Sequence, residues 1–510
     1  MEYRKEKSCD IIVIGAGGSG VVAAARAAFL GVKRIILLEK TKVVGGAALF
    51  ASTFHTFRSE WQARRNIPDQ MEDFIRQGMD ATYWKLDPQL VRNCCLATGQ
   101  YFDWFCEVAG PGTEDKFEEG YYVFDGPSGQ RGPELKGSVC HRGGGLMMMQ
   151  SLHQYCLDKG VEILTQCRAV DVEVEEGRIS AVIAESEDGP IHISCQVCVL
   201  ACGSWVRNDD VVRSVLPEFL DIELDSSCAA HCRDIYTGDG IPMAQKVGAY
   251  LDYDNFVLRL MGPCVLGASE VLNHMGNSAY IIGVNLHGKR WACEPVQRRM
   301  GLFKAGHALI EQPKGLSFCI FDRNNLEAAI ADSQKPKTDD GGFFGNAFFP
   351  STMKETLEDI DKAVSPKDGS AFMADSLEEL AAQIGIDPSA LTETVRRYNE
   401  ACERGYDDDF FKAPENMVPL TRAPYFAVRG RIGSDGAFGG VLVNADMQAY
   451  KKDGNLVEGL YVTGDFASGR FIRLGTYKEQ VLNDCSWAFS SGFLAANSAS
   501  EYLRKVDQGT

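Results

Sequence analysis

The chain has 510 residues, enough for about two to four domains at roughly 100–200 residues per domain. Hydrophobic residues make up 45% and charged residues 24%, a composition that excludes disordered and fibrous proteins. The formal net charge of −18 argues against a partner that is nucleic acid or an anionic membrane surface, because proteins that bind these are usually basic.

The N-terminal segment predicts a βαβ unit. Residues 11–14 are all apolar, as in a strand buried on both faces, and glycines follow at positions 15, 17 and 20. Residues 21–30 are rich in alanine and predict a helix that Gly31 can cap. The apolar run at 35–38 predicts a second buried strand, which ends at Glu39.

The elements that follow alternate between helical and extended patterns. The sequence predicts helices over about 69–110 and 144–160, strands at 161–164 and 197–201, a hairpin over 171–185 that turns at residues 176–177, and a C-terminal helix near 484–502. Alternating strands and helices are typical of α/β proteins.

A change in composition after residue 248 predicts an inserted second domain. The stretch 249–414 carries several phenylalanine pairs and an acidic helix at 376–385, and Pro414 is a plausible boundary. We therefore expect an α/β fold in which residues 1–248 and 415–510 form one Rossmann-type domain. Residues 249–414 would form a smaller α+β domain that caps it.

The 17 cysteines predict reduced thiols in a cytoplasmic protein, because disulfide frameworks occur in short, cysteine-dense secreted chains. We expect no signal peptide before the first strand and no membrane span, since the apolar stretch 11–30 is interrupted by glycines. Cys195, Cys198 and Cys202 invite a metal site. In a strand, however, positions i and i+3 face opposite sides, so we predict no metal.

The glycines at 15–20 match the pattern G-x-G-x-x-G, which is weak evidence when it occurs alone. Here it follows a buried strand and opens a helix, and Glu39 lies 19 residues beyond Gly20 at the end of the next strand. Together these features form a dinucleotide fingerprint. Gly15 permits the tight turn, Gly17 lets backbone N–H groups approach a pyrophosphate, and Gly20 permits close packing of helix and strand. Glu39 can accept hydrogen bonds from the ribose hydroxyls.

Later segments resemble, in order, the motifs of the FAD-dependent fumarate reductase and succinate dehydrogenase flavoproteins, whose relatives include the 3-ketosteroid dehydrogenases. The family's E-K…G-G stretch resembles residues 39–40 with 45–46, and its A-T-G segment resembles residues 201–203. Its T-G-D-G…G-A segment resembles residues 237–240 with 248–249, and its G-x-R-F-x-N-E segment resembles residues 288–294. Its closing flavin motifs resemble residues 439–441 and 459–465.

The resemblance implies that the cofactor is FAD. Gly45 and Gly46 would run along the pyrophosphate, Val170 would lie by the adenine, and Asp465 would hydrogen bond to the ribityl chain. The helix after Asp484 would direct its N-terminus at the flavin pyrimidine ring. The predicted cofactor-binding residues are Gly15, Gly17, Gly18, Ser19, Gly20, Glu39, Lys40, Gly45, Gly46, Ala47, Val170, Ala201, Gly203, Asp239, Gly464 and Asp465.

The same resemblance implies arginines in the catalytic site. In these reductases an arginine four residues after the last Glu of G-x-R-F-x-N-E donates the proton, which corresponds to Arg298, with Arg299 as its rival. A second arginine, in A-N-R-L-G, would bind an anionic oxygen of the substrate and corresponds to Arg473, with Arg470 as its rival. Tyr477 and Tyr425 lie near segments that approach the flavin, and a phenol there could relay a proton.

The sequence also departs from the family at positions that hold the dicarboxylate substrate. Fumarate reductases carry a histidine before the Gly-Gly that corresponds to 439–440, where this chain reads 434–438 as Ser-Asp-Gly-Ala-Phe. Their H-P-T histidine also has no counterpart at 260–263. Some members attach FAD through a histidine near His55, but the R-S-H-T context is absent. We therefore expect non-covalent FAD and a substrate other than fumarate.

The predicted function is reduction of an electron-poor C=C bond, of enoate or enone type, in a small molecule larger than fumarate. Hydride would come from flavin N5, a proton from Arg298 and the electrons from an external donor that the sequence does not identify. Two alternatives use similar chemistry: 3-ketosteroid-type desaturation, and reduction of plant phenolics such as isoflavan intermediates. A third is a flavoprotein subunit that only passes electrons within a larger complex.

Overall fold

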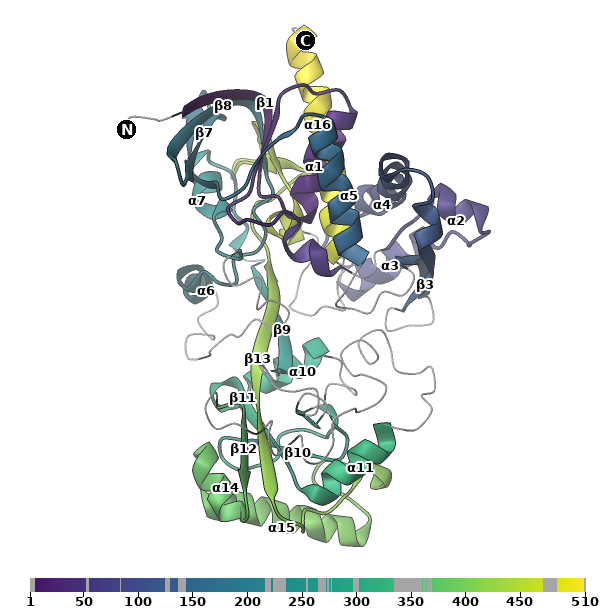
Figure 1. Ribbon diagram of the computed structural model, residues 1–510, viewed down its shortest axis with the longest axis vertical. Helices are drawn as coiled ribbons and strands as arrows, with labels where there is room; N and C mark the ends of the chain where they lie inside the picture. The colour runs from purple at the N-terminus through teal and green to yellow at the C-terminus, as the bar shows by residue number, and fades with distance from the viewer. Residues whose placement is uncertain are drawn as a thin grey trace. The chain divides into compact units, whose positions relative to one another are not determined.

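The computed structural model describes residues 5–51, 55–82, 84–123, 129–135, 144–215, 222, 235–253, 256–264, 272, 275–276, 278–296, 302–333, 360, 364, 369–470 and 484–508. The chain divides into two compact units (Figure 1). Unit 1 comprises residues 1–217, 231–258 and 436–510, and unit 2 comprises residues 218–230 and 259–435. Strands and helices alternate through much of the chain, so the predicted mixed α/β fold class is confirmed.

Unit 1 is built on a mixed sheet whose central strands are parallel. The strand order is β14-β15-β8-β1-β2-β5, and a β6–β7 hairpin extends from β8. The strands are β1 (Lys5–Ile14), β2 (Ile35–Leu38), β5 (Glu162–Leu164), β6 (Arg168–Glu175), β7 (Arg178–Ser186), β8 (Gly189–Leu200), β14 (Gln448–Tyr450) and β15 (Leu456–Val462). A separate two-stranded sheet pairs β3 (Phe117–Val123) with β4 (Gly129–Leu135).

Three long helices of unit 1, α1, α5 and α16, lie side by side (Figure 1). The helices of the unit are α1 (Gly18–Phe29), α2 (Glu60–Arg64), α3 (Met71–Ala81), α4 (Pro88–Ala109), α5 (Gly144–Asp158), α6 (Asp209–Val215), α7 (Gly240–Lys246) and α16 (Asp484–Gln508), with 3-10 turns η1 (Gly46–Phe50), η2 (Glu114–Lys116) and η7 (Gly464–Arg470). The predicted helical stretch 69–110 is two helices, because Asp87 caps a new helix that starts with Pro88.

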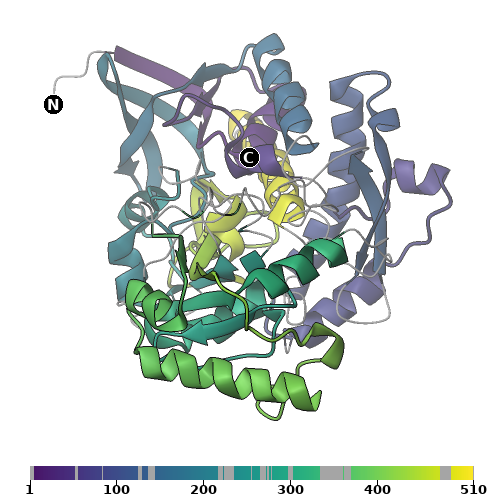
Figure 2. The same cartoon turned by 60° about the horizontal axis from the view of Figure 1, so that its bottom comes forward.

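Unit 2 contains a sheet with the order β10-β11-β13-β12 and β9 paired to β13. The elements are β9 (Val257–Cys264), β10 (Ile282–Asn285), α10 (Leu302–Ile310), η5 (Pro313–Gly315), β11 (Leu316–Phe321), α11 (Arg323–Ser333), β12 (Ala371–Ala374), α14 (Leu377–Ile384), α15 (Pro388–Arg404), η6 (Pro414–Asn416) and β13 (Tyr425–Phe438). Figure 2 shows α14 and α15, in green, along this sheet, where Leu380, Leu391 and Val395 join the apolar core formed with Ile282 and Phe318.

Local sequence signals account for several of these elements. The hydroxyl of Ser376 accepts a hydrogen bond from the Glu379 N–H at 3.1 Å and so caps α14, and Gly385 ends the helix with a φ of +73°. The predicted acidic helix is thus confirmed. The predicted hairpin is confirmed as well, and it turns where Glu176 and Gly177 both have positive φ.

The limits of the compact units differ from the predicted domain boundaries at 248 and 414. Strand β13 pairs with both β11 and β12, so residues up to 435 belong with the sheet of unit 2 and not with residues 436–510. Two of the limits between the units, at 258 and 435, fall within β9 and β13. Among the described helices, none combines the length and the apolar character needed to cross a membrane.

A buried charge cluster joins three segments of unit 2. Arg290 donates to Glu294 at 2.7 Å and to Asp407 at 2.9 Å, and the side chains of all three are at most 4% exposed. Burial alone would lower the Arg290 pKa, but the two carboxylates raise it. Lys412, also buried, donates to the Ile281 carbonyl at 2.6 Å, and burial lowers its pKa. The cluster fixes the loop that contains Glu294 against β10.

We predict that Asp407→Ala lowers the free energy of unfolding by about 3–5 kcal/mol, because it leaves the Arg290 guanidinium buried with half of its compensating charge. The matched control is Asp409→Ala. Asp409 pairs with Arg397 at 2.8 Å, but both side chains are about half exposed, so its loss costs about 0–1 kcal/mol. Denaturant unfolding of both variants measures the difference, and equal losses would contradict the prediction.

Candidate active site

The predicted cofactor residues of unit 1 gather at one edge of its sheet. Strands β15, β8, β1 and β2 run parallel, and their last residues, Val462, Leu200, Ile14 and Leu38, are paired in one level row. Gly464, Ala201, Gly15 and Glu39 follow these strand ends directly or within two residues. Ligands of open α/β sheets bind at the carboxyl ends of parallel strands, so this edge is the candidate cofactor site.

The turn between β1 and α1 requires glycine at two positions. Gly15 has a φ of +100°, and a Cβ there would lie 2.4 Å from the Ala201 carbonyl oxygen. A Cβ on Gly20 would lie 1.9 Å from the Gly15 carbonyl oxygen. No real Cβ contact is that short. Helix α1 therefore packs directly on the turn and on the end of β8, as the fingerprint predicts.

Gly17 differs from these two glycines because its side of the turn is open. It is the N-cap of α1, and a Cβ on it would meet no atom within 4 Å. Gly45 lies beside it in a parallel bridge and donates its N–H to the Ala16 carbonyl at 2.7 Å. Gly46 and Ala47 continue into η1. Bare backbone at a helix N-terminus suits a pyrophosphate, because N–H groups can approach it closely.

Glu39 is 7% exposed and already holds part of this turn together. Its carboxylate accepts hydrogen bonds from the Ala16 N–H at 3.0 Å and the Thr41 N–H at 2.8 Å. A carboxylate has about four acceptor positions, so both oxygens can still accept bonds from ribose hydroxyls. The predicted role of Glu39 therefore fits its position, and the side chain also fixes the β1–α1 turn against the end of β2.

A cluster of charges surrounds Asp239 at the start of α7. Asp239 accepts from Lys40 at 2.9 Å, from Arg168 at 2.7 Å and from the Thr237 hydroxyl at 2.8 Å. Burial alone would raise the Asp239 pKa, but Arg168 and Lys40 hold it below its ordinary value. The motif residues 237–240 are thus tied to the end of β2. Val170, also on β6, is 37% exposed and available to a flat ring.

The sequence reasoning did not identify Arg168. It lies two residues before Val170 on β6, and both residues are exposed while Ala169 between them is buried, as in an alternating strand. Counting two residues back along the strand from Val170, the predicted adenine contact, could therefore have identified Arg168. Its bonds to Asp239 join β6 to α7 beside the predicted site.

The end of β8 carries Ala201, Cys202 and Gly203. Gly203 has a φ of +69°, and a Cβ there would meet no atom within 4 Å, so this backbone is also open. Burial raises the pKa of the Cys202 thiol to about 12, which keeps it protonated at neutral pH. Among the described residues, no group of three His, Cys, Asp or Glu side chains could hold a metal ion.

His55 lies close to the first turn of α16. Its backbone N–H donates to the Ser486 hydroxyl at 2.6 Å, and its ring meets Phe74 edge to face at 5.1 Å between ring centres. Burial lowers the His55 pKa to about 3, so the imidazole is neutral at neutral pH. The side chain is 6% exposed, as expected of a residue of the core.

The predicted catalytic residues fall outside the part of the chain that the structure describes. Arg298 and its rival Arg299 lie in 297–301, and Arg473 and Tyr477 lie in 471–483. Arg470 ends η7. Of the tyrosines, Tyr425 is described: it is half-buried against the apolar core of unit 2, and burial raises its pKa.

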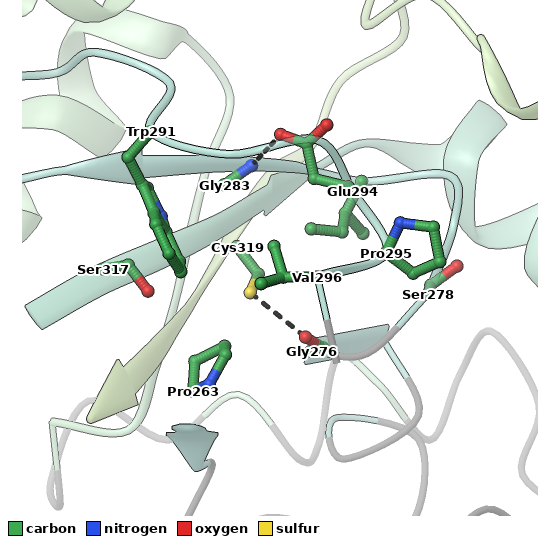
Figure 3. A pocket seen from close by; sticks show the side chains of 11 residues that line it. Pro263, Gly276, Ser278, Gly283, Trp291, Glu294, Pro295, Val296, Ser317 and Cys319 are labelled. Atoms are coloured by element: carbon green, nitrogen blue, oxygen red, sulfur yellow. Dashed lines mark hydrogen bonds between the residues drawn. The ribbon is translucent and has the colours of Figure 1, made fainter. Parts of the chain in front are cut away.

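The segment that precedes Arg298 lines a small cavity in unit 2. Figure 3 shows Trp291, Glu294 and Pro295 around it, together with Pro263, Ser317 and Cys319. The Glu294 carboxylate accepts the Gly283 N–H at 2.8 Å, and the Cys319 thiol lies 3.3 Å from the Gly276 carbonyl oxygen. The cavity offers about 10 Å³ to the centre of a water molecule, room for about one water.

The level strand ends, the open glycine backbone and the acidic residue at the end of β2 define a dinucleotide-binding α/β protein. The chain belongs to the FAD binding domain family, whose model matches residues 10–473. FAD is therefore its cofactor, as the sequence predicts. The residues at the strand ends fit this group through their backbone N–H groups and the Glu39 carboxylate.

Proteins of similar sequence indicate the class of enzyme to which the chain belongs. The chain is 25% identical to a vinyl phenol reductase of Lactiplantibacillus plantarum over 99% of both chains. It is 26% identical to a fumarate reductase (cytochrome) of Shewanella frigidimarina, over 97% of this chain and 78% of that one. Both relatives are reductases by name, one of a vinyl phenol and one of fumarate. The chain is accordingly an FAD-dependent oxidoreductase of the class that acts on CH–CH bonds.

Solved structures share the fold. The open conformation of a flavocytochrome c3 fumarate reductase matches with a TM-score of 0.71 and 20% identity, over 98% of this chain and 79% of that one. A 3-ketosteroid-Δ4-(5α)-dehydrogenase from Rhodococcus jostii RHA1 matches with a TM-score of 0.64 and 21% identity, over 98% of both chains. The predicted family resemblance is confirmed by the family match, and the fold is shared with a 3-ketosteroid dehydrogenase.

We predict that Gly17→Val gives a folded protein without FAD. The φ of −74° and ψ of −172° at Gly17 suit valine, and its Cβ meets no atom of the chain, so only the approach of the pyrophosphate is blocked. Gly20→Val is the control that should fail to fold, because its Cβ overlaps the Gly15 carbonyl. Far-UV circular dichroism and the ratio of FAD to protein test both variants, and full FAD occupancy in Gly17→Val would refute the assignment.

Proposed function

We propose that this protein reduces an electron-poor C=C bond conjugated to a carbonyl or carboxyl group, in a substrate larger than fumarate. The observation that carries the substrate class is the 434–438 segment, where fumarate reductases carry a histidine. Here the Ala437 N–H donates to the Ser204 hydroxyl at 2.7 Å, and Ala437 and Phe438 are at most 3% exposed. Ala437 and Phe438 are thus packed in the interior, and this stretch has no imidazole that could bind a second carboxylate of the substrate.

When bound, and after reduction by an external two-electron donor, FAD would supply the hydride for the carbon β to the carbonyl. Arg298 gives or directs the proton that reaches the α carbon, and its fixed positive charge stabilises the negative charge that develops on the substrate. Arg473 binds the anionic oxygen, because a guanidinium can bind two oxygens at once. Tyr477 is the second proton donor that we consider. The FAD is held without a covalent bond.

We also propose the chain organisation that the sequence predicts. A Rossmann-type FAD domain would come from the two ends of the chain and an α+β cap from its middle. The predicted limits are residues 248 and 414, and the pairing of β13 with β11 and β12 favours a second limit near residue 435. The division into compact units supports an insertion, since unit 1 combines N-terminal and C-terminal residues while most of unit 2 comes from the middle of the chain. A location in the cytoplasm remains a prediction.

A phenolic alkene is the second candidate substrate. The observation that favours it is the similarity of this chain to the vinyl phenol reductase along 99% of both chains. A vinyl phenol lacks the carbonyl that activates the double bond in our first candidate. In that case a group that deprotonates or polarises the phenol, such as a tyrosine or an arginine, would have to activate the substrate.

The substrate class is tested by steady-state assays with reduced viologen as the electron donor. We expect turnover with an α,β-unsaturated ketone or acid that carries a ring, and much slower turnover with fumarate. The comparison includes a vinyl phenol, whose preferential reduction would favour the second candidate. Fumarate turnover as fast as that of the best alternative acceptor would overturn the proposal, because a dicarboxylate site would then be present.

Arg298→Ala should lower kcat by about two orders of magnitude or more, the scale of a general acid or an electrostatic stabiliser. FAD occupancy should remain unchanged, because Arg298 lies outside the glycine-rich segments predicted to hold the cofactor. Arg298→Lys should restore little, since an ammonium does not reproduce a planar fork. Arg299→Ala is the matched control and should be mild. A normal kcat in Arg298→Ala would show that another residue donates the proton, and Tyr477 would be the next candidate.

A further inference from the structure

The peptide groups on both sides of Gly464 are held by one helix. Gly464 follows β15 and has a φ of +66°. The Trp487 indole N–H donates to the Gly464 carbonyl at 2.8 Å, and the Gly464 N–H donates to the Ser491 hydroxyl at 3.0 Å. Trp487 and Ser491 are four residues apart on α16, so they lie on the same face of that helix. Together they fix the direction in which the chain leaves the strand.

The first turn of α1 is joined to the same point. The Thr463 hydroxyl donates to the Ser19 hydroxyl at 3.1 Å, and a Cβ on Gly464 would lie 2.8 Å from the Ser19 Oγ. A Cβ on Gly492 would lie 2.2 Å from the Ser19 carbonyl oxygen, so α16 also packs directly on α1. Three elements that carry predicted cofactor contacts therefore meet here: the start of α1, the end of β15 and the first turns of α16.

These hydrogen bonds are buried, so water cannot replace a partner that is lost. Trp487 is 1% exposed, and Ser491 and Thr463 are 0% exposed. A buried carbonyl that loses its donor cannot turn to water, so the chain around it must shift or accept an unsatisfied group. Neither Trp487 nor Ser491 belongs to the predicted cofactor-binding set. Their bonds end instead on Gly464, which is next to Asp465.

We propose that Trp487 and Ser491 are positioning residues for FAD. By bonding to both peptide groups of Gly464, they hold Asp465 in register with the first turn of α1, so that the ribityl and pyrophosphate contacts can form together. This inference rests on the placement of FAD at the carboxyl edge of the parallel strands. It adds two side chains that need not touch the cofactor and that determine how tightly it is held.

The test compares three variants of the full chain. Trp487→Phe removes the N–H and keeps an aromatic ring, and Ser491→Ala removes the acceptor while placing the best helix former in α16. Trp61→Phe is the matched control: Trp61 is 0% exposed, and its indole N–H has no hydrogen-bond partner among the residues that the structure describes. The Kd for FAD is measured by titration of the apoprotein at a temperature where circular dichroism shows it folded. The visible circular dichroism of the bound flavin is recorded as well.

We expect each of Trp487→Phe and Ser491→Ala to raise the Kd for FAD about tenfold, the effect of one unsatisfied buried group, and to change the flavin spectrum. The control should stay within about twofold of wild type. A purely structural role would lower the apoprotein's unfolding temperature while leaving the Kd and the spectrum unchanged, and that result would overturn the inference. If Trp487→Phe does not fold, Ser491→Ala decides alone. If the wild type itself fails to bind FAD, the cofactor placement fails, and the inference fails with it.

Discussion

The constraint on which the rest of the structure depends is that four parallel strands end in one level row. Leu38, Ile14, Leu200 and Val462 are paired at the carboxyl edge of the sheet. The chain must leave each strand without covering that edge. After β1, β8 and β15 it does so through Gly15, Gly203 and Gly464, all with positive φ. The result is a surface made largely of backbone beside the N-terminus of α1. Backbone N–H groups at such a terminus can bind a phosphate.

Charge is used differently in the two units. In unit 1, Asp239, Lys40 and Arg168 form a partly exposed cluster whose bonds join the end of β2 to β6 and α7. In unit 2, Arg290 lies between two fully buried carboxylates, and its bonds fix the loop that leads toward residue 298. The guanidinium that we propose as catalytic, that of Arg298, would need a rigid base, since a small displacement of a reacting group can cost much of its effect. The buried cluster supplies such rigidity four residues earlier in the chain.

The residues of unit 1 that could be predicted from the sequence are those whose signal is local. The glycine pattern, the apolar strands and Glu39 occupy a short span, and each part has a steric or electrostatic reason that can be recognised without a structure. The caps of α14 and the turn at 176–177 are local in the same way. The order of the later motifs then indicated the family.

Contacts between distant segments could not be predicted in this way. No pattern in the sequence pairs Arg290 with Asp407, Lys40 with Asp239 or Trp487 with Gly464, because these partners are brought together only by the packing of whole elements. The limit of the compact unit near residue 435, where the sequence predicts a boundary near 414, has the same cause. Residues 415–435 resemble the start of a C-terminal segment, but the pairing of β13 with β11 and β12 is a long-range property.

The most direct test of the central claim is a single-turnover experiment without oxygen. The purified protein is reduced to the equivalence point, mixed rapidly with an alkene, and the return of the oxidised FAD absorbance is followed. We predict fast return with a ring-bearing α,β-unsaturated carbonyl compound and formation of one saturated product per FAD. If no alkene restores the absorbance while an artificial electron acceptor does, the chain passes electrons to a partner and is not itself a C=C reductase.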